Sequence, residues 1–156
     1  MSGPESFPGW RQVVLDTTDA RGLAEFYRQL LGFEYRPGDE PPEPGRDDER
    51  GRDWLVIRPS SGGFPRIAFQ QTASVPETTW PEPGIPQQLH LDLSVTSRAE
   101  FDHQHERALR LGARLRFDRS EDPDEQLRVY TDPSGHTFCI FLAPELLTPR
   151  QLRPRS

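Results

Sequence analysis

The 156-residue sequence has no lysine, a single cysteine, and no apolar run of the length that a membrane-spanning helix requires. The lone Cys139 cannot form a disulfide within the chain, which favours a reducing compartment. Residues 1–10 carry neither the basic nor the apolar region of a secretory signal. These absences predict a cytoplasmic protein that does not enter a membrane. Exclusive use of arginine, together with 17 prolines, is typical of a GC-rich coding bias and predicts a bacterial source.

The net charge is −6, from 25 acidic and 19 basic residues. A general nucleic-acid binder needs a basic face that displaces counterions from phosphates, so we expect no nucleic-acid partner. The acidic balance would instead attract cationic molecules at long range.

Two similar series of elements follow one another along the chain, each read as a strand, a helix and three further strands. Apolar and β-branched patterning predicts strands at residues 11–16, 33–36, 53–58 and 66–71, and again at 88–95, 113–118, 127–131 and 137–142. Asp19 begins the first helix as its N-cap, and Gly32 ends it. Ser97, with Glu100 three residues later, forms a capping-box pattern for the second helix, which Gly112 ends.

The two series can be laid over each other, which indicates an internal repeat. Residues 12–15 (QVVL) match residues 90–93 (HLDL), and residues 67–69 (IAF) match residues 138–140 (FCI). A polar stretch at residues 37–52 is expected as a loop, and residues 72–87, which have no periodicity, are expected as a linker.

The segments VVLDTTDARGLAEFYRQLLGFEY and TDPSGHTFCIF resemble the opening and the closing hairpin of the glyoxalase/bleomycin-resistance/dioxygenase superfamily, also called vicinal oxygen chelate proteins. Within it, the pattern is most similar to the glyoxalase-like branch. The resemblance implies an α+β fold of two βαβββ modules forming a cupped mixed sheet, and a homodimer. It places one domain at residues 10–143, with modules at about 10–71 and 88–143, the linker at 72–87, and tails at 1–9 and 144–156.

Alternation along the strands predicts which side chains face the cup, because successive residues point to opposite faces. The residues expected to contact a ligand are Gln12, Asp16, Trp54, Gln70, His90, Asp92 and Phe141. For Asp16 and Gln70 a structural hydrogen bond is the competing interpretation, and Trp54 could equally lie in the core. Trp80, in the linker, is expected either to cover the pocket or to pack at a subunit interface.

Metal-dependent relatives place four ligands, usually His or Gln, Glu, His and Glu, at positions that here hold Gln12, Ala68, His90 and Cys139. Alanine has no donor, and cysteine replaces a carboxylate, so we expect no metal and no other cofactor. The alternative is a divalent metal at Gln12 and His90, with Asp16 or Asp92 as substitute ligands.

Three functions follow from these residues. The first is a metal-independent small-molecule binding or resistance protein, similar to bleomycin-resistance proteins, whose ligand is an antibiotic or metabolite of aromatic or cationic character. The second is an enzyme, a lyase, isomerase or dioxygenase, with His90 as a base assisted by Asp92 or as a metal ligand. Cys139 is the alternative nucleophile, although a buried small residue is the competing interpretation. The third is a scaffold or regulatory module without a ligand.

Overall fold

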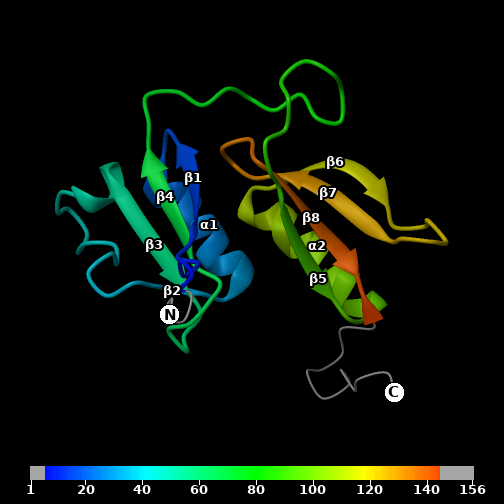
Figure 1. Ribbon diagram of the computed structural model, residues 1–156, viewed down its shortest axis with the longest axis horizontal. Helices are drawn as coiled ribbons and strands as arrows, with labels where there is room; N and C mark the ends of the chain where they lie inside the picture. The colour runs from blue at the N-terminus through cyan, green and yellow to red at the C-terminus, as the bar shows by residue number, and fades with distance from the viewer. Residues whose placement is uncertain (1–5, 145–156) are drawn as a thin grey trace, which may run out of the picture. The chain divides into compact units, whose positions relative to one another are not determined.

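A computed structural model describes residues 6–144. The chain forms two compact units, and the boundary between them in the sequence falls between Ala73 and Ser74. Each unit holds one four-stranded mixed sheet and one α-helix (Figure 1). The fold is therefore α+β, as predicted. The predicted N-terminal tail is described only from Ser6, and the predicted C-terminal tail lies outside the described residues except for Pro144.

The first unit contains β1 (Val13–Thr17), α1 (Ala20–Leu31), β2 (Glu34–Tyr35), β3 (Trp54–Arg58) and β4 (Ile67–Gln71). Its strand order is β1-β4-β3-β2, with β1 parallel to β4 and the other neighbours antiparallel. Asp19 caps α1 by accepting a hydrogen bond from the Gly22 amide at 2.9 Å, and Gly32 ends the helix in the left-handed conformation. Both helix-boundary predictions are confirmed.

The second unit contains β5 (Leu91–Val95), α2 (Arg98–Leu111), β6 (Arg114–Arg119), β7 (Leu127–Thr131) and β8 (Thr137–Leu142). Its order, β5-β8-β7-β6, repeats that of the first unit, again with the first and last strands parallel. The Ser97 hydroxyl accepts a hydrogen bond from the Glu100 amide at 3.2 Å, which confirms the predicted start of α2. The internal repeat is therefore present in topology as well as in sequence.

Each helix packs on one face of the sheet in its own unit. In the first unit Tyr27 of α1 stacks on Phe69 of β4, with ring centroids 5.9 Å apart. In the second, His105 of α2 bonds the Tyr130 hydroxyl at 2.9 Å, and Tyr130 stacks on Phe138 at 5.1 Å. Within residues 6–144, the α-helix of each unit lies on one face of its sheet only, and we call the opposite face the open face.

The start of the opening strand in each unit differs from the prediction, and this affects the two candidate donors Gln12 and His90. Gln12 and His90 were assigned to the opening strands, but β1 begins at Val13 and β5 at Leu91. Ladder pairing with the fourth strand of each unit begins only there. Sequence alternation cannot detect where a long-range partner starts, so both side chains lie just before their strands.

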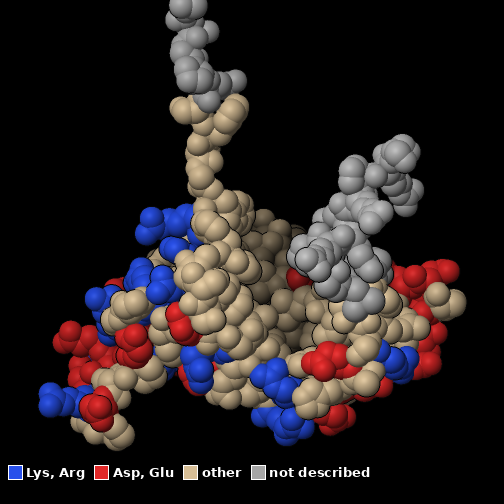
Figure 2. Space-filling model, turned by 90° about the horizontal axis from the view of Figure 1, so that it is seen from below, with Lys and Arg blue, Asp and Glu red and all other residues tan. Residues whose placement is uncertain are grey.

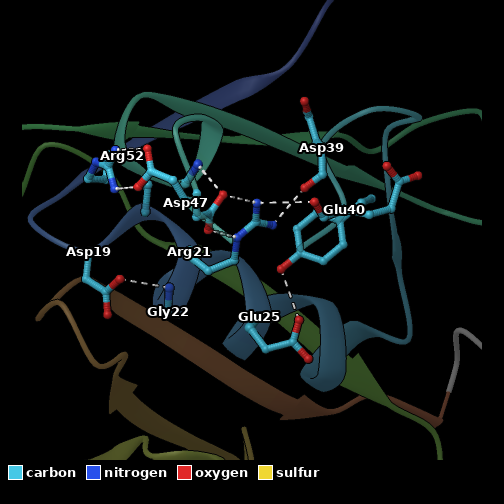
Figure 3. A network of polar contacts seen from close by, with 12 residues as sticks. Asp19, Arg21, Gly22, Glu25, Asp39, Glu40, Asp47 and Arg52 are labelled. Atoms are coloured by element: carbon cyan, nitrogen blue, oxygen red, sulfur yellow. Dashed lines mark hydrogen bonds and ion pairs between the residues drawn. The ribbon is translucent and has the colours of Figure 1, made fainter. Parts of the chain in front are cut away.

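The segment 37–52 is more ordered than the predicted loop, because it ends in a 3₁₀ turn at Arg50–Arg52 and is held by a polar network (Figure 3). The Arg21 guanidinium bonds both carboxylate oxygens of Asp48, at 2.8 and 3.0 Å, and the Asp39 carbonyl at 2.7 Å. The Asp39 side chain is fully buried and accepts from the Val56 amide at 2.9 Å. This network ties the segment to α1 and β3.

Charged side chains of both signs lie next to one another on the surface. On the face shown in Figure 2, basic and acidic side chains are interspersed, without a large patch of a single sign. Among the described residues, no helix is long and apolar enough to cross a membrane.

Candidate functional site

The open face of the first sheet brings three of the predicted ligand contacts into one row. In the ladder, Asp16 lies opposite Gln70, and Gln70 lies opposite Trp54. Asp16 and Gln70 are exposed and Trp54 is half-buried. The row therefore offers a carboxylate, an amide and an indole side by side. Gln12 precedes β1 and is half-buried, outside this row.

The next row of the same face is apolar. Ala68 lies opposite Val14 on one side and Val56 on the other, and Ala68 is fully buried. None of the three side chains has a donor atom. The position where metal-dependent relatives carry a carboxylate is therefore part of an apolar strip in this unit.

The open face of the second sheet assembles donor groups from two adjacent strands. Asp92 on β5 lies directly opposite Cys139 on β8, and the His90 Nε2 atom is 3.2 Å from Asp92 Oδ1. One donor atom of each of His90, Asp92 and Cys139 lies within 4.8 Å of the others. His90 and Asp92 are exposed and Cys139 is buried. The structure thus brings together three of the residues that the sequence singled out.

Apolar side chains surround this group on the same face. Leu127, Val129 and Cys139 form a buried cluster, and Trp80 and Phe141 pack against it. Trp80 belongs to the linker, and the Arg116 guanidinium bonds its carbonyl at 3.3 Å. Trp80 therefore lies over the open face of the second sheet within its own unit.

The environment of Cys139 keeps its thiol protonated. Burial, together with the charge of Asp92 and a hydrogen bond to its carboxylate, raises the pKa of Cys139 to about 11. A thiol attacks as the thiolate, so a raised pKa argues against the alternative in which Cys139 is a nucleophile. The thiol instead connects the apolar cluster to the exposed His90–Asp92 pair.

Thr137 is a residue of this face that sequence reasoning missed. It lies two positions before Cys139 on β8, so its side chain points to the same face. It is only 4% exposed, and its hydroxyl oxygen is buried with no hydrogen-bond partner among the described residues. Such an orphan hydroxyl is costly unless something else satisfies it. No local pattern in the sequence signals this, because it depends on what covers the strand.

A pocket of about 420 Å³ opens at the end of this sheet. Its lining comprises Pro123, Asp124, Glu125, Gln126, Phe141, Leu142, Ala143 and Pro144. Phe141 lines the pocket and also packs on the apolar cluster, so the two features adjoin. The pocket is within the size range typical of small-molecule sites, and its two carboxylates favour a cationic group.

The residues at the four positions used by metal-dependent relatives do not form such a site here. Ala68 has only a methyl group, and the remaining carboxylate position is the thiol of Cys139. Gln12 and Ala68 belong to the first unit, whereas His90 and Cys139 belong to the second. The usual set with two carboxylates is therefore not reproduced.

Comparisons with known proteins agree with this architecture. The family model of the glyoxalase-like domain matches residues 12–141. A search of curated proteins finds no relative that matches the sequence. Among solved structures, a glyoxalase/bleomycin resistance protein/dioxygenase family enzyme from Burkholderia phytofirmans is 19% identical, with 84% of this chain and 95% of that chain covered and a TM-score of 0.58.

Two further solved structures share the fold. Lactoylglutathione lyase from Agrobacterium tumefaciens is 18% identical over 89% of this chain and 97% of that chain, with a TM-score of 0.52. The fosfomycin resistance protein FosX from Listeria monocytogenes, complexed with Mn(II) and a dihydroxypropylphosphonic acid, is 17% identical over 92% of this chain and 100% of that chain, with a TM-score of 0.61. The family model covers residues 12–141, most of the chain, and this shows that the chain belongs to the glyoxalase-like domain family.

Proposed function

We propose that the chain is a small-molecule binding protein that holds a cationic or aromatic ligand without the four-donor metal of its metal-dependent relatives. The carrying observation lies in the second unit, where a pocket lined by two carboxylates shares Phe141 with the apolar cluster, and Cys139 of that cluster lies opposite Asp92. The apolar position of Ala68 supports the metal-independent form, since no carboxylate is available there.

Each part of the site has a distinct role in this proposal. Phe141 and Trp80 supply flat apolar surface for stacking or for contact with a cation. Asp124 and Glu125 attract positive charge at the pocket. His90 and Asp92, both exposed, hydrogen-bond polar groups of the ligand and orient it. In the first unit Asp16, Gln70 and Trp54 form a second candidate contact row.

The test is a binding titration in the presence of EDTA, with metal-free bleomycin as the first probe of a panel of cationic aromatic antibiotics. Ligand at a hundred times its Kd stabilises a protein by about 2.7 kcal/mol. In a chain of this size that raises Tm by roughly 5–10 °C. Phe141→Ala should weaken binding at least tenfold, whereas Phe64→Ala, an exposed aromatic of the first unit, should not. Binding that requires added metal, or that survives Phe141→Ala unchanged, contradicts the proposal.

One observation favours an enzyme as the second candidate. The 3.2 Å contact between His90 and Asp92 is the arrangement in which a carboxylate orients an imidazole for proton transfer. In that case His90 would be the base and Asp92 its positioning residue. Incubation with lactoylglutathione and with fosfomycin, followed by product analysis, tests it. Turnover lost in His90→Ala, with ligand binding retained, would favour the enzyme over the binding protein.

The homodimer expected from the family resemblance stays a prediction. Light scattering of the purified protein measures its mass in solution directly. A monomer at micromolar concentration would show that the proposed ligand site is complete within one chain.

A further inference from the structure

Three donor groups of different chemistry converge on the open face of the second sheet. Asp92 and Cys139 lie directly opposite each other on the parallel strands β5 and β8. His90 precedes Asp92 by two residues, and its Nε2 lies 3.2 Å from the Asp92 carboxylate. Nitrogen, oxygen and sulfur donors are thus all within 4.8 Å of one another.

These separations are close to those that a tetrahedral metal requires. With metal–ligand distances of about 2.0–2.3 Å, neighbouring donors in a zinc site lie roughly 3.5 Å apart. The exposed side chains of His90 and Asp92 can adjust over about 1 Å, whereas Cys139 is fixed in the buried cluster. The sheet register therefore supplies a rigid thiol and two adjustable partners.

The donor set selects a different metal from that of a carboxylate-rich site. A thiolate with an imidazole and one carboxylate suits borderline ions such as Zn²⁺ and Co²⁺, and is poorly matched to Mg²⁺ or Mn²⁺. Three protein donors also leave a fourth position, which water or a ligand atom completes.

Thr137 gives a second, independent indication of a ligand at this point. Its hydroxyl is buried, has no partner among the described residues, and lies on the same face two residues before Cys139. The ladder between β5 and β8 begins with Leu91 opposite Phe138, and His90 and Thr137 are the residues that immediately precede this pair. A water molecule in the fourth position of a metal held by His90 would offer this hydroxyl a hydrogen-bond partner.

The geometry points to a thiolate-ligated site for Zn²⁺ or a similar borderline ion at His90, Asp92 and Cys139, within the second unit alone. Binding breaks the S–H bond of Cys139, forms a metal–sulfur bond and releases the proton to solvent. The ion keeps its charge, so no oxidant or reductant is involved. This site uses the face of the proposed ligand but does not rest on that proposal, since metal-free protein can still bind the ligand.

The test is a Co²⁺ titration of the EDTA-treated, dialysed protein, because cobalt reports its ligands spectroscopically where zinc is silent. We expect one Co²⁺ per chain, a thiolate-to-cobalt charge-transfer band in the near ultraviolet, and loss of both on addition of Zn²⁺. Since the chain has one cysteine, that band can come only from Cys139. Absence of the band in the wild-type protein overturns the inference.

Variants separate the ligands from their surroundings. Cys139→Ser should remove the band, and His90→Ala and Asp92→Asn should each weaken Co²⁺ at least tenfold. His90 and Asp92 are exposed, so these two variants should keep their fold, which circular dichroism checks. His103→Ala, on the exposed side of α2, is the matched control and should change nothing. Equal Co²⁺ affinity in His90→Ala and His103→Ala would contradict the assignment.

Thr137→Val tests the fourth position. The Co²⁺ affinity of this variant should stay within about twofold of the wild-type affinity. The binding of azide to the cobalt site, measured from the ligand-field bands, should become weaker. Unchanged azide affinity would exclude Thr137 from the site. Failure of Co²⁺ binding with intact binding of the antibiotic probe in EDTA would reject this inference and leave the proposed function standing.

Discussion

Removal of the Asp92 charge should make the Cys139 thiol more reactive in metal-free protein. Burial, the Asp92 charge and the hydrogen bond to its carboxylate raise the pKa of Cys139 from 9.0 to about 11. Near pH 8 the thiolate fraction, and with it the alkylation rate, should therefore be about a hundredfold below that of an ordinary thiol. Burial is the largest cause of the raised pKa, and it is still present in Asp92→Asn. We therefore expect this variant to increase the alkylation rate of Cys139 by at most about tenfold.

The measurement is the pH dependence of alkylation by iodoacetamide in EDTA, followed by mass spectrometry. The single cysteine makes the signal unambiguous. Ser94→Ala is the matched control, because Ser94 lies on the same strand and face, two positions further along the ladder, opposite Phe141. A slower or unchanged rate in Asp92→Asn, relative to Ser94→Ala, would refute the electrostatic coupling across β5 and β8.

The remaining predictions concern stability. Asp39→Ala leaves the Val56 amide without its acceptor and should lower the free energy of unfolding by about 1–3 kcal/mol. Asp47→Ala, which removes an ion pair that is 62% exposed on both sides, should have a much smaller effect, and urea denaturation measures both variants. Ser97→Ala should cost about 1 kcal/mol and Ser97→Gly only a few tenths, by the same assay. A hydrogen bond from Arg28 is the main cause that lowers the pKa of Glu25 to about 2. The ionised Glu25 carboxylate therefore stabilises the fold above its ordinary pKa of 4.5, and this contribution is lost as the pH falls toward about 2. Glu25→Gln should flatten that part of the plot of stability against pH, and identical plots for the two proteins would contradict the prediction.

Helix boundaries were predictable from the sequence because their signals are local. Asp19 and Ser97 each accept from an amide three residues later, and Gly32 and Gly112 adopt the left-handed conformation that ends a helix. The order of the strands followed from the repeat. These features depend on neighbours within a few residues, where sequence patterns carry most information.

Features that depend on long-range partners were not predictable in the same way. Asp39 looks like one more acidic residue of a polar loop, yet its side chain is buried against the amide of Val56, 17 residues away. Thr137 has nothing in its sequence context that indicates an orphan hydroxyl. His90 was assigned to the right neighbourhood but to a strand that begins one residue later. Each case requires knowledge of what lies across the sheet.

The repeat also shows how the two units have come to differ. Val14 pairs with Ala68 in the first unit at the ladder position where Asp92 pairs with Cys139 in the second. The backbone register is the same, but one pair is wholly apolar and the other carries a carboxylate and a thiol. A site that draws equally on both units requires donors at both positions. The concentration of donors in the second unit therefore favours a site carried by that module alone.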